Sequence, residues 1–214
     1  MNWHTWIEQH MPATEIQRGG AAVWPKDGHG LIGDALGPVM HLHDDASEIF
    51  YFVGGRCRLE IGSSQEILGA GDFVLVPSGV PHNLWNEGND DLFVFWIVAP
   101  NFVHNKWRTE NFPPSAVERR ALRSRVAPGA DLPGDENIRT RLLTLLPHVV
   151  HSARTGKRQE AIMYLVEGQA DVRVGLLGGR LAQHDFVHVP VDTAYSVGSI
   201  GGSTSVFLFE MPAV

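Results

Sequence analysis

The sequence has a single cysteine and no long run of apolar residues. With Cys57 alone, the chain can form neither an intrachain disulfide nor a zinc site built from cysteines. The apolar runs, such as residues 49–53 and 93–99, fall far short of the roughly 20 residues that a membrane-spanning helix needs. Residues 1–17 show no basic start, apolar stretch or small-residue cleavage site of a secretory signal. We therefore expect a cytoplasmic protein without a membrane partner.

An excess of positive charge is also missing. The chain has 17 Lys and Arg against 24 Asp and Glu, a net charge of −7, and its basic residues form no long stripe. No helix-turn-helix pattern is visible either. These absences argue against nucleic acid as the main partner. The 23 glycines, 13 prolines and 43% hydrophobic residues are typical of a folded, turn-rich globular protein.

The sequence contains an internal repeat. A shift of 113 residues sets IFYFVGG at residues 49–55 over IMYLVEG at residues 162–168. Without a gap, the same shift sets GDFVLVP at residues 71–77 over HDFVHVP at residues 184–190. About ten positions are identical across this stretch, more than unrelated β segments should share. The repeat therefore predicts two similar halves.

Both halves consist of short β-branched and aromatic runs separated by Gly, Pro, Asn or Asp, which is typical of an all-β sandwich or barrel. Between them, the basic residues 115–125 begin with Ser115 and Glu118, a spacing that favours a helical capping box. The arginines of this stretch are expected to face solvent or another subunit. We predict an all-β protein with a first domain at residues 1–100, a partly helical linker at 101–140 and a second domain at 141–214.

The histidines include a candidate metal site. With 11 histidines in the chain, the pair His41 and His43 could arise by chance. In a strand, however, residues i and i+2 point to the same face, so this pair would place two imidazoles side by side. Glu48 follows five residues later, and His82 lies on a later segment. Three histidines and one carboxylate suit a divalent transition metal such as Fe, Mn, Ni, Cu or Zn.

Glycines and prolines around these residues complete two motifs. They read Gly37-x3-His41-x-His43-x4-Glu48-x6-Gly55 and Gly71-x5-Pro77-x-Gly79-x2-His82-x3-Asn86. This pattern resembles the cupin family. The second motif matches at every defining position, whereas in the first the opening Gly is separated from His41 by three residues instead of the usual five. The resemblance implies a small antiparallel jelly-roll barrel in which His41, His43, Glu48 and His82 converge on one metal.

The second half lacks these ligands. The 113-residue shift sets the four ligand positions over Arg154, Gly156, Ala161 and Tyr195. His148, His151 and Glu160 lie near the first motif but out of register, so a second metal site would need a different geometry. The chain thus resembles a bicupin with one metal-competent barrel and one degenerate barrel, kept for structure, for closing the pocket or for a dimer interface. The family also implies a homodimer.

Resemblance to the dioxygenase cupins implies that the metal binds O2 together with a small apolar or aromatic enol, phenol or diketone. Fe(II) is the metal expected first, with Mn, Ni, Cu or Zn as the other candidates. Glu48 would then be a ligand or a catalytic base. The residues predicted to line the substrate pocket are Phe50, Phe52, Trp85 and Trp96. Two alternatives stay open, a Lewis-acid isomerase, lyase or decarboxylase that uses no O2, and a non-catalytic small-molecule-binding barrel. Neither motif contains an Arg to clamp a dicarboxylate, although Arg56, Arg58 or Arg108 could reach inward.

Overall fold

The computed structural model describes residues 19–24, 40–61, 64–99, 107–108, 122–125 and 132–213. Within these segments every regular element is a strand, which confirms the predicted all-β class. None of the described segments contains a helix of the length and apolarity that crossing a bilayer requires. The chain divides into two compact units, Met1–Ala127 and Pro128–Val214.

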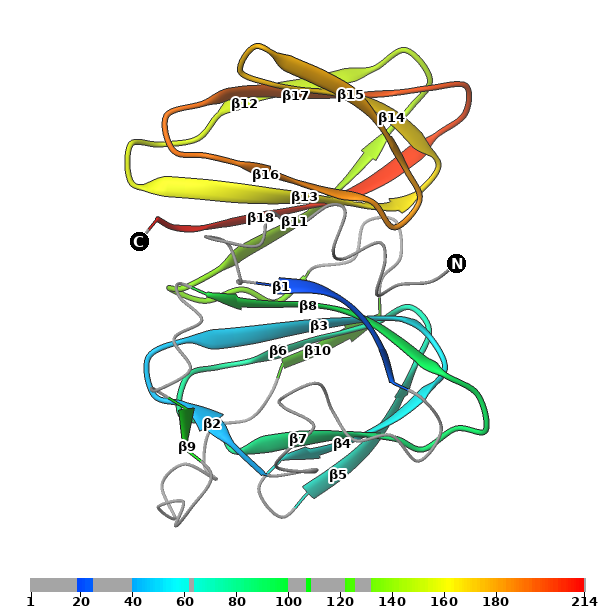
Figure 1. Ribbon diagram of the computed structural model, residues 1–214, viewed down its shortest axis with the longest axis vertical. Helices are drawn as coiled ribbons and strands as arrows, with labels where there is room; N and C mark the ends of the chain where they lie inside the picture. Colours follow the sequence, from blue (N-terminus) through cyan, green and yellow to red (C-terminus); the bar gives the residue numbers. More distant parts are fainter. Residues whose placement is uncertain are drawn as a thin grey trace. The chain divides into compact units, whose positions relative to one another are not determined.

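The first unit consists of two facing antiparallel sheets (Figure 1). The five-stranded sheet has the order β1-β8-β3-β6-β10, and the three-stranded sheet has the order β5-β4-β7. A short pair, β2 and β9, adds to them. The strands are β1 (Gly19–Trp24), β2 (Leu42–His43), β3 (Ser47–Gly54), β4 (Arg56–Ile61), β5 (Ser64–Gly69), β6 (Asp72–Val76), β7 (His82–Asn86), β8 (Leu92–Ala99), β9 (Trp107–Arg108) and β10 (Leu122–Arg125).

Side chains alternate between the two faces of each strand, and those on the inner faces form the core of the first unit. Phe50 and Phe52 of β3 pack inward with apolar side chains of both sheets, including Leu59 of β4 and Leu84 of β7. Residues two apart share a face, so the residues between them point to the other side of each sheet. Glu48, two residues before Phe50, therefore points to the same inner face as the aromatic core.

The linker prediction needs a correction at its basic end. Leu122–Arg125, which we expected to close a helix, forms strand β10 and pairs antiparallel with β6. β6 would otherwise expose a row of unpaired backbone groups at the sheet edge, and pairing with β10 satisfies them. Tertiary pairing thus overrides the local helical pattern. Residues 115–121, where the capping box lies, are outside the described residues, so a helix there stays a prediction.

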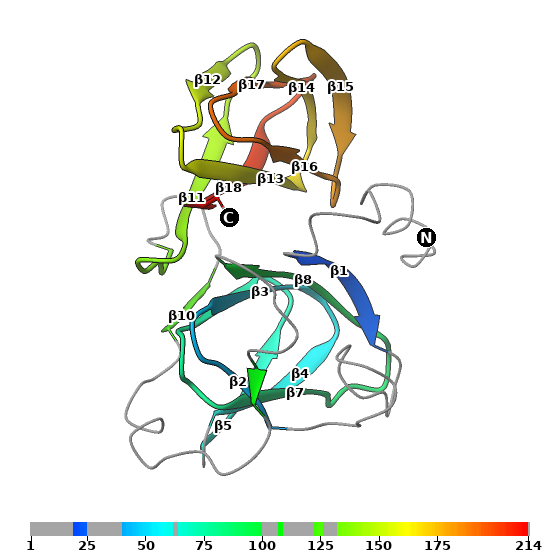
Figure 2. The same cartoon turned by 60° about the vertical axis from the view of Figure 1, so that its left-hand side comes forward.

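The second unit repeats this architecture with two four-stranded antiparallel sheets (Figure 2). Their orders are β11-β18-β13-β16 and β12-β17-β14-β15. The strands are β11 (Arg139–Leu145), β12 (Val150–Arg154), β13 (Gln159–Glu167), β14 (Gln169–Val174), β15 (Leu177–Ala182), β16 (Phe186–Val189), β17 (Ala194–Ser199) and β18 (Thr204–Pro212). The tandem of two similar antiparallel barrels predicted from the repeat is thereby confirmed.

Even the irregularities of the two units correspond. The register of β3 on β8 shifts between Phe52 and Gly54, and that of β13 on β18 shifts between Leu165 and Glu167, at repeat-equivalent positions. His184, which replaces the turn glycine Gly71, keeps a left-handed backbone with φ of 73°. Such a conformation is uncommon for a residue with a Cβ, so the turn is imposed by the surrounding strands.

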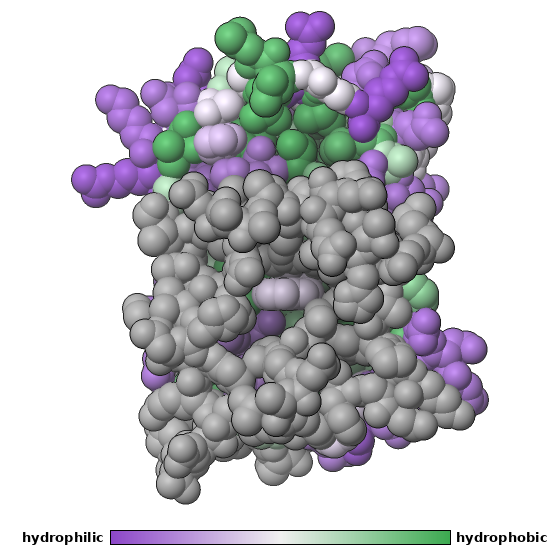
Figure 3. Space-filling model, in the orientation of Figure 1, coloured by the Kyte–Doolittle hydropathy of each residue, from purple (hydrophilic) through white to green (hydrophobic). Residues whose placement is uncertain are grey.

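The β14–β15 hairpin exposes hydrophobic side chains. Leu176 and Leu177 are largely exposed, and hydrophobic surface is visible on the second unit at the top of Figure 3. The core of this unit is instead built from inward residues such as Met163, Leu208 and Val197. The tip of the hairpin therefore contributes little to the core.

Candidate metal centre

Backbone hydrogen bonds bring the two histidine segments together. His41 and His82 form an isolated antiparallel bridge in which each amide donates to the other's carbonyl oxygen, at 3.0 and 2.8 Å. The amide of Gly79 donates to the carbonyl oxygen of His43 at 2.7 Å. Gly79 has a φ of 76°, which lets the chain turn closely past β2. The first motif and the second are therefore held side by side before any side chain is considered.

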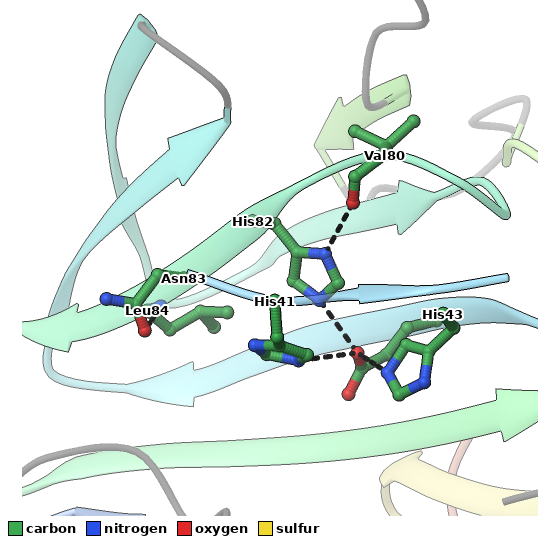
Figure 4. A network of polar contacts seen from close by, with 7 residues as sticks. His41, His43, Val80, His82, Asn83 and Leu84 are labelled. Carbon is green, nitrogen blue, oxygen red and sulfur yellow. Dashed lines mark hydrogen bonds and ion pairs between the residues drawn. The ribbon is translucent and has the colours of Figure 1, made fainter. Parts of the chain in front are cut away.

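The four predicted ligands meet at one carboxylate oxygen (Figure 4). Nε2 of His82 and Nε2 of His43 lie within hydrogen-bond distance of Oε2 of Glu48, at 2.9 and 3.1 Å. Nε2 of His41 lies 4.0 Å from the same oxygen. All four side chains are buried. The structure thus brings together the complete ligand set that the sequence motifs predict.

The ring of His82 is held in one orientation. Its Nδ1 donates to the carbonyl oxygen of Val80 at 2.9 Å, so Nε2 is the nitrogen directed at Glu48 (Figure 4). A carbonyl oxygen can only accept, which assigns a hydrogen to Nδ1 and leaves Nε2 as the metal-binding atom. The backbone of Val80 is therefore a part of the site that the sequence analysis missed. A main-chain carbonyl leaves no signal in residue identity.

The carboxyl group of Glu48 is stabilised in its charged form. Burial by itself raises the pKa of this group, but the hydrogen bonds and positive charge from His43 and His82 oppose burial and prevail. The pKa of Glu48 consequently lies well below its usual range. Glu48 is a carboxylate at every physiological pH, as a metal ligand must be.

The donor set fits a divalent transition metal. The four ligand atoms lie within 4.8 Å of one another. An ion bound at about 2.1 Å from each donor would place neighbouring donors roughly 3–4 Å apart, so small rotations of the side chains would suffice. Three neutral imidazoles and one carboxylate leave such an ion with a net positive charge. The buried carboxylate and the imidazole nitrogens thus surround a place that suits a cation.

Three of the four predicted substrate residues lie inside the barrel. Phe50 and Phe52 belong to the core, the ring of Phe50 lies 6.0 Å from that of His82, and Trp96 packs against the same cluster. Trp85 does not join them. It lies on the opposite face of β7 from Leu84, with the guanidinium of Arg58 5.1 Å from its ring. The structure thus places Phe50 nearest the ligands and directs Trp85 away from them.

The second unit has no comparable centre among its described residues. Ala161 and Tyr195 occupy two of the former ligand positions, and Arg154 forms an ion pair with Asp192 at 3.1 Å. Across the described part of the chain, the cluster in the first unit is the one place where three or more possible metal ligands converge. His148 and His151 therefore do not assemble a second metal site with Glu160.

Comparison with known proteins agrees with this picture. Residues 32–98 match the family model of the cupin domain. A stretch of 78 residues is 27% identical to an uncharacterized protein of Methanocaldococcus jannaschii, covering 34% of this chain and 62% of that relative. Both motifs and all four candidate ligands lie within the matched region, so this part of the first unit is similar to a cupin domain.

Solved structures extend the likeness to the whole chain. Salicylate 1,2-dioxygenase from Pseudaminobacter salicylatoxidans is 14% identical with a TM-score of 0.67, covering 90% of this chain and 70% of that protein. YlbA from E. coli is 12% identical with a TM-score of 0.63 over 95% and 86% of the two chains. Oxalate decarboxylase from Bacillus subtilis is 16% identical with a TM-score of 0.54 over 82% and 64%. The chain therefore shares its two-barrel fold with these proteins.

Proposed function

We propose that the first barrel is the site of a metal-dependent dioxygenase that acts on a small apolar or aromatic enol, phenol or diketone. The observation that carries this proposal is the buried cluster of His41, His43, Glu48 and His82 beside the ring of Phe50. The fold shared with salicylate 1,2-dioxygenase supports it. Fe(II) is the metal we expect first, with Mn, Ni, Cu or Zn as the other candidates.

A redox-active metal at this cluster would supply a place for O2 and substrate to meet. O2 is the oxidant, the substrate is the reductant, and both oxygen atoms end in the product. The chain's own residues provide the rest. His82 is pre-oriented by Val80, and Glu48 contributes the single negative charge, which leaves the loaded site positive and favours an enolate or phenolate. Because the pKa of Glu48 is low, we assign it to metal binding ahead of proton abstraction.

The interior of the barrel favours an apolar substrate. Phe50 and Trp96 are cross-strand partners on β3 and β8, and Phe52 follows on the same face. Arg56 is exposed, and Arg58 lies on the outer face of β4. Neither therefore reaches inward to clamp a small dicarboxylate. The side chain of Arg108 is outside the described part of the structure.

A second function is a non-oxidative reaction in which the metal serves only as a Lewis acid. The shared fold of oxalate decarboxylase favours this alternative. A barrel that binds a small molecule without turnover is the third. The Lewis-acid reaction uses the same metal ligands, so only the reaction separates it from a dioxygenase, whereas the binding barrel requires neither turnover nor a metal.

Metal analysis combined with O2 uptake tests the proposal. Protein purified without chelator or added metal is analysed for its elements, and O2 consumption is followed with catechols, flavonols and β-diketones. We expect about one Fe, Mn, Ni or Cu per chain and substrate-dependent O2 uptake. About one Zn or Ni without O2 uptake would move the assignment to the Lewis-acid reaction. No metal even after reconstitution would leave only the binding barrel.

Substitutions of the proposed ligands test where the metal binds. His41→Ala, His82→Ala and Glu48→Gln should each lower metal content by at least about tenfold, because ligand removal costs more than the loss of an outer partner. Glu160→Gln is the matched control, since Glu160 is also a buried strand glutamate bonded to a histidine, His188 at 3.0 Å. Full metal content in the His82 variant would refute the site.

The remaining expectations are part of the proposal. The partner is a small-molecule substrate, and homodimer formation is checked on a sizing column. The cytoplasmic location stays a prediction.

A further inference from the structure

The second barrel encloses a polar cluster formed by Arg141, His151, Tyr195 and Glu210. Arg141 of β11 and Glu210 of β18 form an ion pair at 3.0 Å. His151 of β12 and Tyr195 of β17 lie on the opposite sheet, with ring centroids 6.1 Å apart. Each sheet thus contributes two polar residues.

All four residues belong to the inner faces of their strands. Tyr195 is itself a member of the buried core, and the core residues Leu143, Ala153 and Leu208 lie two positions from Arg141, His151 and Glu210. Residues two apart on a strand share a face. The cluster therefore lies on the faces that the two sheets turn toward each other, with Arg141 and Glu210 partly exposed at its edge.

This cluster lies where the first barrel has its metal ligands. Ala161 takes the position of Glu48 in the repeat, and its partner across the sheet is Glu210, as Val98 is the partner of Glu48. Tyr195 takes the position of His82. The second barrel has thus exchanged metal-binding groups for a different set of polar groups at the same place in the fold.

Three atoms of the cluster lack hydrogen bonds although they are shielded from solvent. They are Nε2 of His151, the hydroxyl of Tyr195 and Nε of Arg141. Tyr195 is only 4% exposed. A buried polar atom without a partner is destabilising, and natural proteins rarely keep one unless something else satisfies it. A bound ligand that accepts hydrogen bonds from all three groups would satisfy these atoms.

The protonation states of the cluster and the side chains around it indicate which kind of ligand fits. Burial and the charge of Arg141 lower the pKa of His151, while burial and Glu210 raise the pKa of Tyr195, so both are neutral at pH 7 and can donate. Together with the N–H of Arg141 they offer three donors. Tyr195 pairs with Ala153 on one side and Val174 on the other, and Glu210 pairs with Ala161 and Arg139. Each therefore has one small alanine side chain beside it, and the neighbouring core residues are apolar.

We propose that the second barrel binds a small monocarboxylic acid with an apolar body, its carboxylate held by Tyr195, His151 and Arg141. The two oxygens of a carboxylate can accept hydrogen bonds from all three donors, and hydrogen bonds to a charged acceptor are stronger than those to a neutral one. The side chains of Arg141 and Glu210 are 37% and 22% exposed, which gives the acid a route from solvent. Glu210 competes with the acid for Arg141 and limits its affinity.

The proposal is tested by titrating the full-length, metal-loaded protein with benzoate and butyrate in a calorimeter, with benzamide as the uncharged probe. We expect saturable binding of benzoate or butyrate, with an affinity higher than that of benzamide. Tyr195→Phe should weaken this binding about tenfold or more, as expected for one hydrogen bond to a charged group. Glu210→Gln should strengthen it, because the guanidinium is then free for the ligand.

Tyr164→Phe serves as the matched control, since it removes a hydroxyl bonded to His184 elsewhere in the same unit, and it should leave acid binding unchanged. Acid binding that survives in Tyr195→Phe and disappears on chelation belongs to the first barrel. If that were the only binding found, the proposal would be overturned. So would an absence of saturable binding by either acid, or equal affinity for benzoate and benzamide.

Discussion

His82 is fixed at three points before it meets a metal. Its amide and carbonyl bond to His41, and its Nδ1 bonds to Val80. A side chain that is already ordered loses little conformational entropy when it binds an ion. His82 is thus preorganised for binding a metal.

Cys57 gives the first prediction at the scale of residues. Its side chain is fully buried, and burial raises the pKa of its thiol to about 12, against weaker lowering by a backbone hydrogen bond from Trp85 and by Arg58. At pH 8 only about one thiol in ten thousand would be ionised. We expect no labelling of the native protein by a thiol reagent within minutes and full labelling after unfolding in guanidinium. Rapid stoichiometric labelling of native protein would contradict this burial.

At the scale of elements, one turn is repeated in both barrels. Gly55 joins β3 to β4 and Gly168 joins β13 to β14, with φ of 86° and 90°. A Cβ on Gly55 would lie 2.7 Å from the carbonyl oxygen of Asp91, and one on Gly168 would lie 2.7 Å from that of Ser203. Both turns therefore require glycine for conformation and for space.

Alanine at these turns should destabilise its own barrel. Left-handed backbone costs a residue with a Cβ about 1–2 kcal/mol, and the close backbone contact adds to this. We expect Gly55→Ala and Gly168→Ala each to lower the free energy of unfolding by at least this amount in urea denaturation. Gly179→Ala is the control, because a Cβ on Gly179 would meet no atom within 4 Å and its backbone is not left-handed. Equal stability of all three variants would contradict the argument.

At the scale of the whole molecule, the two units carry different polar centres at equivalent places. The first holds three imidazoles around Glu48, and the second holds the ion pair of Arg141 and Glu210 facing His151 and Tyr195. Both centres lie on the inner faces of a barrel whose strands match in order and in irregularity. The shared fold therefore supports distinct chemistry in each unit.

Metal removal should affect the first unit selectively. All six tryptophans lie within Met1–Ala127, so tryptophan fluorescence reports on that unit alone. A ligand present at about 100 times its Kd stabilises a native state by about 2.7 kcal/mol. We expect chelation to lower the fluorescence-detected Tm by on the order of 10 °C, and metal addition to restore it. His82→Ala should melt at the same temperature with and without chelator.

Acid should destabilise the second unit through two histidines. Burial and the charge of Arg141 lower the pKa of His151, against Glu210, and burial lowers that of His184, against Asp185. Below about pH 6.5 the unfolded chain therefore binds protons that the folded unit does not. Stability should be level above this pH and fall as the pH drops through the window below it.

Hydrogen exchange resolved by unit measures this effect. His151→Gln should flatten the decline in the second unit, whereas His148→Gln, at an exposed turn, should leave it unchanged. A decline that is identical in the His151 variant and the parent would show that other groups cause it.

Much of the site could be read from residue identity and spacing. Two imidazoles two apart on a strand must share a face, and glycines and prolines at set distances mark the turns that bring the segments together. The repeat likewise predicted two barrels, since identical spacing of strands and turns demands similar pairing. The shared face of His41 and His43 and the positions of the turns depend on local geometry, which a short stretch of chain decides by itself. The convergence of His82 and Glu48 with this pair was expected only from the resemblance to the cupin family.

Only the tertiary structure decided the rest. It placed Trp85 on the outer face under Arg58, turned Leu122–Arg125 into a strand on β6, and directed His82 through the carbonyl of Val80. It also gathered Arg141, Glu210, His151 and Tyr195 from four strands of two sheets. Apart from the contact of His82 with Val80, which depends on the backbone conformation of a turn, these features depend on contacts between segments distant in sequence, where strand pairing and burial outweigh local preference.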